Sequence, residues 1–195
     1  MKKLRTLFAA LLMLAALSPA RATSVVPLYL DELIDTAAVA FDGKVLANRV
    51  ERDPATNLVV TYTTFEVREM LKGAVGATHT IKQVGGTLAA ENVRYHVEGI
   101  PAFTVGESYV VFLAGVSDRG FSSPMGLSQG RFGIQAGGAG LRVSNGRDFR
   151  DMTARMASRL PGASGATMKA AREPVRDMDL GEFKQAVRNH LAGAK

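Results

Sequence analysis

The sequence contains no cysteine and no tryptophan among its 195 residues. The absence of cysteine excludes a disulfide framework, thiolate zinc sites, iron–sulfur centres, a cysteine nucleophile and a lipidated N-terminal cysteine. Because 47% of the residues are hydrophobic, a chain of this length buries a core without disulfides or a structural metal. We therefore expect a globular protein, for which one folded domain is the default.

Residue patterns that support catalysis or cofactor binding are also scarce. Asp42, Asp53 and Asp118 stand singly and lack the spacing of a calcium-binding loop. Two glycine-rich stretches, 85–87 and 136–140, lack the Lys-Ser/Thr pair of a phosphate-binding loop. The strand aromatics are typical of a core, and no internal repeat is found. We therefore assign no catalytic residue, no metal ligand and no cofactor.

His96 is the histidine for which two interpretations stay open. It lies between Arg94 and Glu98 on the outward side of a short alternating stretch, which favours a solvated surface position. The alternative is a metal ligand paired with Glu91 or Glu98. The spacing of known histidine–glutamate metal motifs is missing here.

The other two histidines are expected to have structural roles. His79 shares a strand face with Ile81, so we expect it to be partly buried. His190 flanks the apolar stripe of the last helix, where a histidine interacts favourably with the C-terminal end of the helix dipole.

Residues Met1–Ala22 have the three parts of a secretory signal peptide. Three basic residues open the segment, Leu7–Leu17 is an unbroken apolar run, and Ala20-Arg21-Ala22 provides small residues for cleavage after Ala22. The run is too short for a transmembrane span, which needs roughly 20 apolar residues. No second apolar run of that length follows. The sequence predicts a periplasmic or secreted protein without membrane insertion after cleavage.

Removal of this leader changes the charge balance. The full chain has 24 basic and 18 acidic residues, and the leader removes four basic residues and no acidic one, leaving 20 against 18. Basic residues gather in the last third of the chain, but acidic residues are interspersed among them, which is typical of a solvated surface. No clustered basic face is present, so we expect no nucleic-acid partner.

The first part of the mature chain predicts a helix followed by two long strands. Apolar residues repeat at helical spacing over Leu30–Ala37, and period-two alternation follows over Ala38–Val50 and again over Leu58–Met70. In the second strand the apolar residues change from even positions, as at Val60, to odd positions, as at Phe65. This change predicts a β-bulge near Thr63-Thr64, and bent strands of this kind suit a small closed barrel.

Several shorter strands are predicted after these two. Glu107–Leu113 ends in a continuous apolar run, which favours a strand buried on both faces. Gly126–Gln135 is interpreted as the strand that closes the barrel. The others are Thr78–Val84, Val93–Val97 and Leu141–Val143.

The C-terminal region is predicted to be helical. Apolar residues lie at helical spacing from Phe149 to Leu160. The Gly/Ala/Ser-rich composition of Gly162–Pro174 is typical of a linker. Asp179 and Glu182 have the spacing of a capping box at the start of a last helix. We expect residues 146–195 to form a loosely attached, partly flexible extension of a β domain at 23–145.

The order of these elements resembles a known family. The segments concerned are Ala38–Val45, Tyr62–Lys72, Val105–Gly115 and Gly126–Phe132. They resemble the netrin-like, OB-type barrel of tissue inhibitors of metalloproteinases, and also a group of exported bacterial proteins with the same pattern. The resemblance, over about residues 30–135, implies a mainly β fold: a small closed barrel of five to six strands with a short N-terminal and a C-terminal helix.

The inhibitors place an N-terminal cysteine on the catalytic zinc of the protease. This chain has no cysteine, and its mature form is expected to begin near Thr23, with no disulfide to staple that end. The inhibitory mechanism therefore does not transfer residue by residue from the resemblance.

Ser128 lies in a G-x-S-x-G sequence, Gly126-Leu127-Ser128-Gln129-Gly130. In hydrolases this motif follows a buried strand and opens a helix, which exposes the serine on a sharp turn. Here a strand-like stretch follows instead. A hydrolase that uses Ser128, or a metal at His96, is kept as an alternative.

The first functional hypothesis is an exported, non-catalytic binding module with a protein partner. OB-type barrels bind through a sheet face and adjacent loops. We therefore expect the binding surfaces at Glu51–Asn57 and Gly85–Gly99. A protease inhibitor-like protein is the second hypothesis. The sequence leaves the ligand and the oligomeric state open.

Overall fold

The fold is mainly β with three helices. The structure is a computed structural model, and it describes residues 25–138, 140–158 and 173–193. The predicted leader (1–22) and most of the predicted linker lie outside these residues. The elements in chain order are α2 (Leu30–Thr36), β1 (Val39–Arg52), β2 (Val59–Lys72), β3 (Thr78–Val84), β4 (Gly86–Leu88), the 3₁₀ helix η1 (Ala89–Glu91), β5 (Val93–Tyr95), β6 (Ser108–Leu113), β7 (Arg131–Gly137), β8 (Gly140–Ser144), α3 (Phe149–Ser158), β9 (Met178–Asp179) and α4 (Leu180–Gly193).

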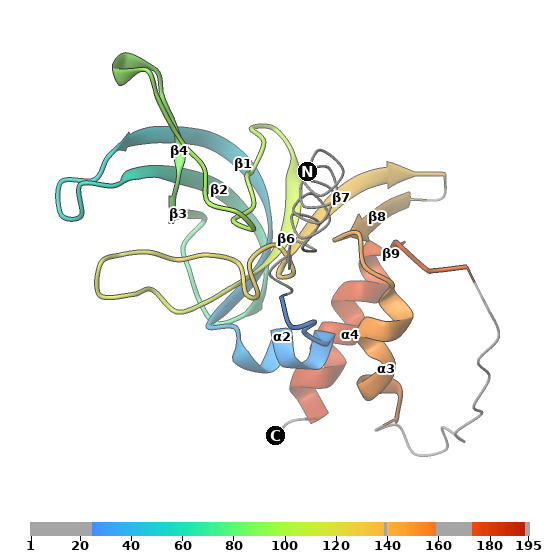
Figure 1. Ribbon diagram of the computed structural model, residues 1–195. Helices are drawn as coiled ribbons and strands as arrows, with labels where there is room; N and C mark the ends of the chain where they lie inside the picture. Colours follow the sequence, from blue (N-terminus) through green and yellow to red (C-terminus); the bar gives the residue numbers. More distant parts are fainter. Residues whose placement is uncertain (1–24, 139, 159–172, 194–195) are drawn as a thin grey trace, which may run out of the picture.

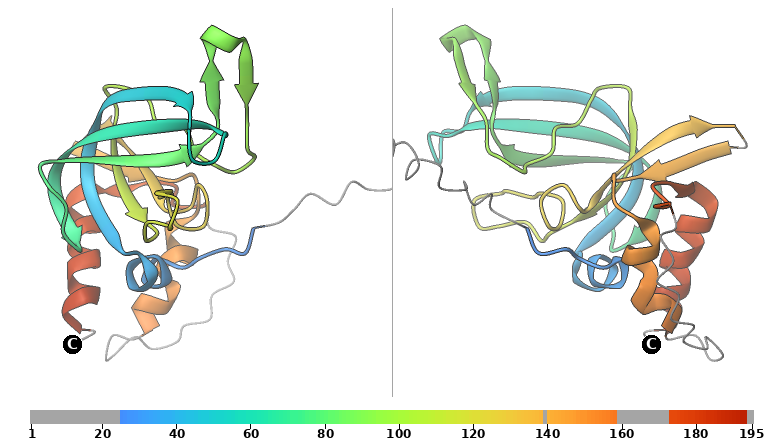
Figure 2. Two further views of the ribbon diagram at one scale, coloured as in Figure 1. Left: turned by 90° about the vertical axis from the view of Figure 1, so that its left-hand side faces the viewer. Right: turned by 45° about the vertical axis from the view of Figure 1, so that its right-hand side comes forward.

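The predicted mainly β fold is confirmed, but the sheet is not closed by hydrogen bonds into the predicted barrel of five to six strands. Seven strands form one antiparallel sheet in the order β3-β2-β1-β6-β7-β8-β9, and hydrogen bonds do not close it. Strands β4 and β5 form a separate hairpin. Figures 1 and 2 show this hairpin projecting from one end of the molecule, with α3 and α4 at the other end.

The stretch predicted to close the barrel does not reach β3. Its first five residues form turns, and the strand proper, β7, pairs with β6 on one side and β8 on the other. A loop after β6 approaches the edge of β3 instead, where the Ser122 N–H donates to the Lys82 carbonyl at 3.1 Å. This loop is rich in Gly, Ser and turn residues and includes Pro124, which has no N–H to donate to a continuous ladder.

Strand β6 lies in the middle of the sheet and serves two hydrophobic cores. Val110 and Phe112 contribute to the core on the helix side, which includes buried residues of all three helices. Tyr109, Val111 and Leu113 contribute to a second core on the opposite face, which we call the inner face because β1–β3 curve around it. The prediction that this stretch is a strand buried on both faces is confirmed.

The predicted position of the β-bulge in β2 is wrong. Thr63 pairs in regular register with Asn48, and the register shift nearby leaves Leu46 of β1 as the extra residue. Tyr62 stays on the face opposite Thr63, where the Arg49 guanidinium lies 4.5 Å from its ring centroid. The predicted bulge would have turned Tyr62 toward the core. The ring packs against the Arg49 cation on the outer face instead, so β2 needs no extra residue at this point.

The C-terminal helices are integral to the helix-side core. Helix α4 buries Phe183 and Val187 in it, and α3 buries Phe149 and Met152. The expectation of a loosely attached extension is therefore wrong for the described parts of both helices. None of the described helices is long and apolar enough to cross a bilayer.

Helix α4 begins where the capping residues predict. The Asp179 carboxylate accepts a hydrogen bond from the Glu182 N–H at 3.1 Å, which satisfies one donor of the first turn. On the next turn Lys184 donates to the carboxylates of Asp42 in β1 and Glu69 in β2. The helix is thus tied to two strands by charge as well as by apolar packing.

Candidate functional site

One end of the inner face is filled by aromatic rings. Phe41 contacts Phe65 edge to face with a centroid distance of 5.5 Å, Phe65 contacts Phe103 at 5.0 Å, and Phe103 contacts Tyr109 at 5.1 Å. Edge-to-face pairs at these distances are favourable. They hold Phe103, and with it the chain segment 97–103, against the sheet.

Farther along the same strands the inner face becomes polar. Asn48 of β1 and Thr63 of β2 are partners in register, and Gln83 of β3 lies two residues after the buried Ile81. The Thr63 hydroxyl donates to Asn48 Oδ1 at 2.8 Å, and Asn48 Nδ2 donates to the Phe103 carbonyl at 2.7 Å. These bonds fix two polar side chains on a sheet that packing already makes rigid.

Gln83 is the third polar residue of this end, and its amide is not satisfied. The residue is 3% exposed, and its Nε2 has no hydrogen-bond partner among the residues that the structure describes. A buried polar group left without a partner costs about 1–3 kcal/mol. Such a group in a folded protein calls for a physical explanation.

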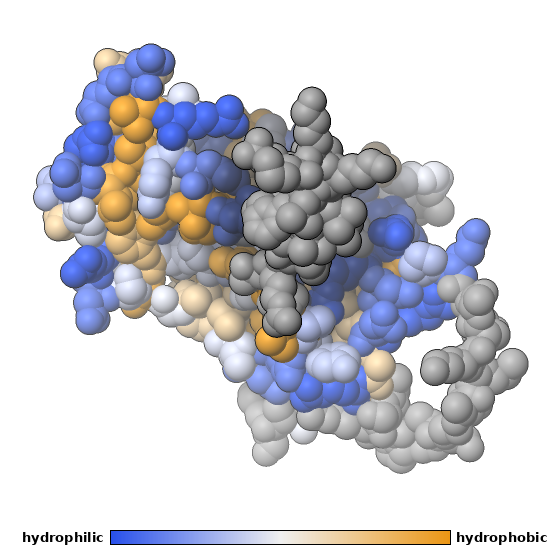
Figure 3. All heavy atoms as spheres, in the orientation of Figure 1, coloured by the Kyte–Doolittle hydropathy of each residue, from blue (hydrophilic) through white to orange (hydrophobic). Residues whose placement is uncertain are grey.

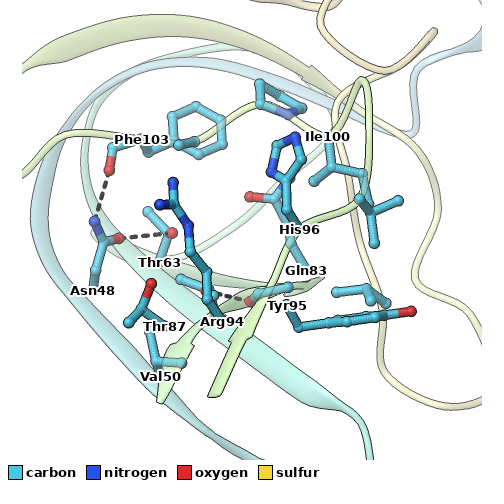
Figure 4. A pocket seen from close by; sticks show the side chains of 17 residues that line it. Asn48, Val50, Thr63, Gln83, Thr87, Arg94, Tyr95, His96, Ile100 and Phe103 are labelled. Carbon is cyan, nitrogen blue, oxygen red and sulfur yellow. Dashed lines mark hydrogen bonds between the residues drawn. The ribbon is translucent and has the colours of Figure 1, made fainter. Parts of the chain in front are cut away.

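These three side chains lie at the floor of a pocket of about 370 Å³. Its walls come from the β4–β5 hairpin and from the segment 97–103. Figure 4 shows the strands curving around the cavity, with side chains of the hairpin and of this segment opposite Asn48 and Thr63. The volume lies at the lower end of the range for small-molecule sites, roughly 300–1,000 Å³.

Two glycines direct the chain from β3 over the pocket. Gly85 and Gly86 have φ angles of +105° and +142°, which residues with a Cβ rarely adopt. A Cβ on Gly86 would lie 2.7 Å from Thr61 Oγ1 and 2.7 Å from Val50 Cγ1. Thr61 in turn donates to the Gly85 carbonyl at 2.6 Å. The hairpin can therefore cross β1 and β2 closely only because glycine is present.

The tip of the hairpin is held by an ion pair. Arg52, the last residue of β1, donates to both carboxylate oxygens of Glu91 in η1 and also to the Asn57 carbonyl at 3.0 Å. These hydrogen bonds hold the pKa of Glu91 below its ordinary value. The two predicted binding surfaces, Glu51–Asn57 and Gly85–Gly99, are thus linked to each other, but only the second lines the pocket.

Arg94 is the one permanently charged side chain among the described residues that line the pocket. None of these lining residues is Asp or Glu, and His96 also lines the cavity. Figure 4 shows the Arg94 side chain extending across the cavity toward Phe103. His96 Nε2 lies 3.5 Å from a carboxylate oxygen of Glu98, whose side chain is 99% exposed. His96 is exposed, as its position on the outward side of the strand predicts.

The other two histidines lie outside the pocket. His79 is partly buried, as predicted, with its ring centroid 5.7 Å from that of Phe41, and burial lowers its pKa. His190 lies in the last turn of α4, where its Nε2 is 2.7 Å from Asp35 Oδ1. Within the described residues, no group of three or more His, Asp or Glu side chains could hold a metal ion.

Ser128 lies in an exposed turn immediately before β7. Gly126 and Leu127 both have positive φ angles, of +57° and +63°, and the Ser128 carbonyl accepts the Arg131 N–H at 3.2 Å. A strand follows the serine, whereas a nucleophile elbow is followed by a helix. In the part of the chain that the structure describes, no hydrogen bond joins the Ser128 side chain to a histidine.

The predicted binding surface at Gly85–Gly99 includes the hairpin wall of the pocket. The floor residues Asn48, Thr63 and Gln83 lie in predicted strands for which the sequence indicated no functional role. The available signal was a polar residue in period-two register with buried apolar ones, as Thr63 is with Phe65 and Gln83 with Ile81. A polar side chain at a position expected to face the core is informative, because its burial costs free energy unless it is paired.

Comparison of the sequence with models of known protein families gives no match, and comparison with curated protein sequences gives none either.

Proposed function

We propose that this chain is an exported, non-catalytic binding module that recognises a protein partner with the pocket and the β4–β5 hairpin. The observation that carries the proposal is the pocket, whose floor consists of buried polar side chains and which opens beside a projecting hairpin. Because hydrogen bonds and ring packing already position most of its walls, binding there costs little ordering of the protein.

The composition of the hairpin supports a role in recognition. Tyr95 is 42% exposed and Arg94 is exposed beside it. Tyrosine and arginine are the residue types that most often dominate binding energy at interfaces. In Figure 3, apolar residues form a band along the end of the molecule that carries the hairpin, and hydrophilic residues border it.

We further infer that β1–β3, β6 and β7 correspond to an OB-type, netrin-like sheet. Their order, β3-β2-β1-β6-β7, and their antiparallel pairing support this interpretation. OB-folds are partly open five-stranded barrels. The sheet here is likewise open, and the 114–124 loop contacts the edge of β3 through the Ser122–Lys82 hydrogen bond.

Export to the periplasm or the medium rests on the predicted leader, 1–22. Expression of the whole chain in a bacterial host tests this part of the proposal. The protein recovered outside the cytoplasm should begin at Thr23, as read by N-terminal sequencing. Retention of the whole chain in the cytoplasm would contradict it.

The binding proposal is tested by affinity capture with the whole exported chain carrying a C-terminal tag. The test variant is Arg94→Glu, which reverses the charge at the pocket. The matched control is Arg119→Glu, which makes the same charge change at an exposed arginine outside the pocket lining. We expect one protein to be captured by the unchanged chain and by the control, and to be lost with Arg94→Glu.

Equal capture by both variants would show that the partner binds elsewhere, and the proposal would then fail. Circular dichroism spectra and melting temperatures of the two variants should match those of the unchanged chain. Because both side chains are exposed, neither substitution removes core packing.

A second candidate, a protease inhibitor-like protein, is favoured by the way the segment before α2 is held. Gln129 accepts the Leu28 N–H at 2.8 Å and donates to the Val26 carbonyl at 3.0 Å. Arg147 donates to the Leu28 carbonyl at 2.5 Å. Hydrogen bonds thus hold this segment, in which Val26 is 76% exposed, against the protein. The absence of cysteine had predicted that nothing would fix this end of the chain.

The inhibitor candidate predicts that the exported chain slows at least one enzyme in a panel of metalloproteases. The variant Gln129→Ala should then inhibit less well, because it loses both hydrogen bonds to the segment. Failure to slow any enzyme of the panel would remove this candidate.

A further inference from the structure

Arg94 has no anionic partner among the described residues. Arg52, which holds the tip of the same hairpin, pairs with Glu91 instead. Within the described residues, no hydrogen bond or ion pair involves the Arg94 side chain. Because no carboxylate is among the described residues that line the pocket, the permanent positive charge of Arg94 faces the cavity without a nearby negative charge.

The floor of the pocket offers a second hydrogen-bond donor that, like Arg94, has no partner among the described residues. Gln83 Nε2 is buried and has no partner, so it can donate hydrogen bonds into the pocket. The other floor groups are engaged already, because Asn48 Nδ2 donates to Phe103 and the Thr63 hydroxyl donates to Asn48. Among the lining side chains, the Arg94 guanidinium and the Gln83 amide N–H are donors without a partner in the described part of the chain, and both favour acceptor oxygens on the ligand.

Part of the lining is apolar. Val50, Val97, Ile100 and Phe103 contribute aliphatic and aromatic surface to an open cavity of about 370 Å³. A ligand that satisfies this surface has a small apolar body next to its acceptor group. Phosphate fits less well, because phosphate sites gather several backbone N–H groups or several cations, and this pocket has one permanent cation.

We propose that this pocket binds a monocarboxylate, with Arg94 pairing with the carboxylate and the Gln83 amide donating to it, and with the apolar body of the ligand against Phe103 and Ile100. The inference rests on the proposed binding function and specifies the ligand chemistry of the same site. A carboxylate matches both unpartnered donors, and a guanidinium–carboxylate pair is among the strongest polar contacts in proteins.

The same chemistry occurs in a small organic acid and in the C-terminal carboxylate of a polypeptide. The two sources are distinguished by matched probes. Phenylacetate represents the small acid, and phenylacetamide is its neutral match. The dipeptide leucyl-phenylalanine with a free carboxylate represents a polypeptide end, and its C-terminal amide is the neutral match. Inorganic phosphate serves as the anion without an apolar body.

The test is an NMR titration of the purified chain with each probe. We expect at least one acid to shift the amide signals of residues 83–97 and to bind at least about tenfold more tightly than its own amide, since the charge-assisted contact is lost in the amide. The tighter of the two acids identifies the source. Equal affinity for acid and amide, tighter binding of phosphate, or no binding of either acid would each overturn the inference.

Two variants locate the contact. Arg94→Gln should weaken binding of the acid about tenfold, whereas Arg119→Gln, the matched charge control, should leave it unchanged. Gln83→Leu should also weaken binding of the acid, while an unchanged circular dichroism spectrum shows that the fold is kept. An Arg94→Gln variant that binds the acid as tightly as the unchanged chain would overturn the assignment.

The outcome of this experiment is separable from that of the capture experiment. If a protein is captured in an Arg94-dependent manner and no acid binds, the carboxylate inference fails and the proposed function stands. If an acid binds in an Arg94-dependent manner and no protein is captured, the carboxylate site stands and the protein partner fails.

Discussion

At the scale of single residues, the buried polar side chains next to the pocket have hydrogen-bond partners, whereas the amide nitrogen of Gln83 in the pocket has none among the described residues. Lys82 donates to Asp53 Oδ1 at 2.7 Å inside the protein, and Thr56 donates to Asp53 Oδ2 at 2.6 Å. These residues close the turn after β1 and have a structural role. Gln83, the next residue after Lys82, faces the pocket instead and keeps an unpaired amide. Gln83 is thus the residue that combines an unpaired buried amide nitrogen with a place in the pocket lining.

The unpaired amide leads to a prediction about stability. Gln83→Leu replaces a buried group without a partner by an apolar one of similar size, and should raise the free energy of unfolding by about 1–2 kcal/mol. Urea denaturation measures this change. Thr63→Val is the comparison, because it breaks a hydrogen bond on the same floor and should lower stability. Destabilisation by Gln83→Leu would show that the amide has a partner in solution.

A second residue-scale prediction concerns Glu69 and acid. Burial raises the pKa of Glu69, but hydrogen bonds from Lys184 and Arg188 outweigh burial and hold the pKa below 4.5. A carboxylate with a lowered folded-state pKa adds stability that is present above its unfolded value and is lost as the pH falls through the folded one.

We therefore expect this contribution to disappear below pH 4.5, the unperturbed value for this group. Urea midpoints at neutral pH and at about pH 3 measure the loss. The drop between the two pH values should be smaller for Glu69→Gln than for the unchanged chain. For the exposed Glu66→Gln it should be the same as for the unchanged chain. An identical drop in all three proteins would contradict the prediction.

At the scale of elements, the β4–β5 hairpin forms a wall of the pocket because it crosses closely over β1 and β2. Gly86→Ala places a Cβ 2.7 Å from side-chain atoms of Thr61 and Val50, at a φ of +142°. We expect it to displace the hairpin and to lower stability by about 1–3 kcal/mol.

Gly106→Ala is the matched control. Gly106 has a φ of +88°, but nothing lies within 4 Å of its Cβ position, so only backbone strain is added. Both variants should lose stability in urea denaturation, but only Gly86→Ala should move the NMR signals of residues 86–97. Equal spectral changes in the two variants would show that the close crossing does not position the hairpin.

A second element-scale prediction concerns the attachment of α4. Lys184→Met leaves the Asp42 carboxylate, whose side chain is 5% exposed, as a buried charge without its cation. Removal of one member of a buried pair typically costs roughly 3–5 kcal/mol. The double variant Asp42→Val/Lys184→Met removes both charges and should recover much of this loss in urea denaturation. A double variant less stable than Lys184→Met would contradict this assignment.

At the scale of the whole molecule, the sheet carries two cores that share β6 but differ in how they are covered. Helices α2, α3 and α4 pack on one face. On the other face the aromatic rings fill only one end, and the open end becomes the pocket. The site therefore lies on the part of the inner face that the aromatic rings leave uncovered, between the sheet, the β4–β5 hairpin and the segment 97–103.

The shared core predicts that sheet and helices unfold together. Phe183→Ala removes a ring that packs on Phe112, Phe132 and Phe149. We expect a loss of about 3–5 kcal/mol in a single transition, seen alike by circular dichroism and by tyrosine fluorescence. Gln185→Ala, at an exposed position of the same helix, should change stability by less than about 0.5 kcal/mol. Two separate transitions would show that the helices fold independently of the sheet.

Much of the secondary structure was predictable from the sequence because it depends on local patterns. Period-two alternation predicted β1 and β2, a strand was predicted at β3, and the run ending at Leu113 predicted a strand buried on both faces. The cap at Asp179 predicted where α4 begins to within one residue. These features follow from side-chain periodicity and from hydrogen bonds over a few residues, which neighbouring residues alone determine.

The site and the closure of the sheet were decided only by the tertiary structure. Whether β7 returns to β3 depends on pairing between segments far apart in the chain, and no local pattern encodes that choice. The floor of the pocket joins Asn48, Thr63 and Gln83, which come together only when three strands are in register. Arg94 faces them because Gly86 permits the hairpin to cross. The sequence by itself determined the strands and their faces; the long-range register decided which polar side chains share a cavity.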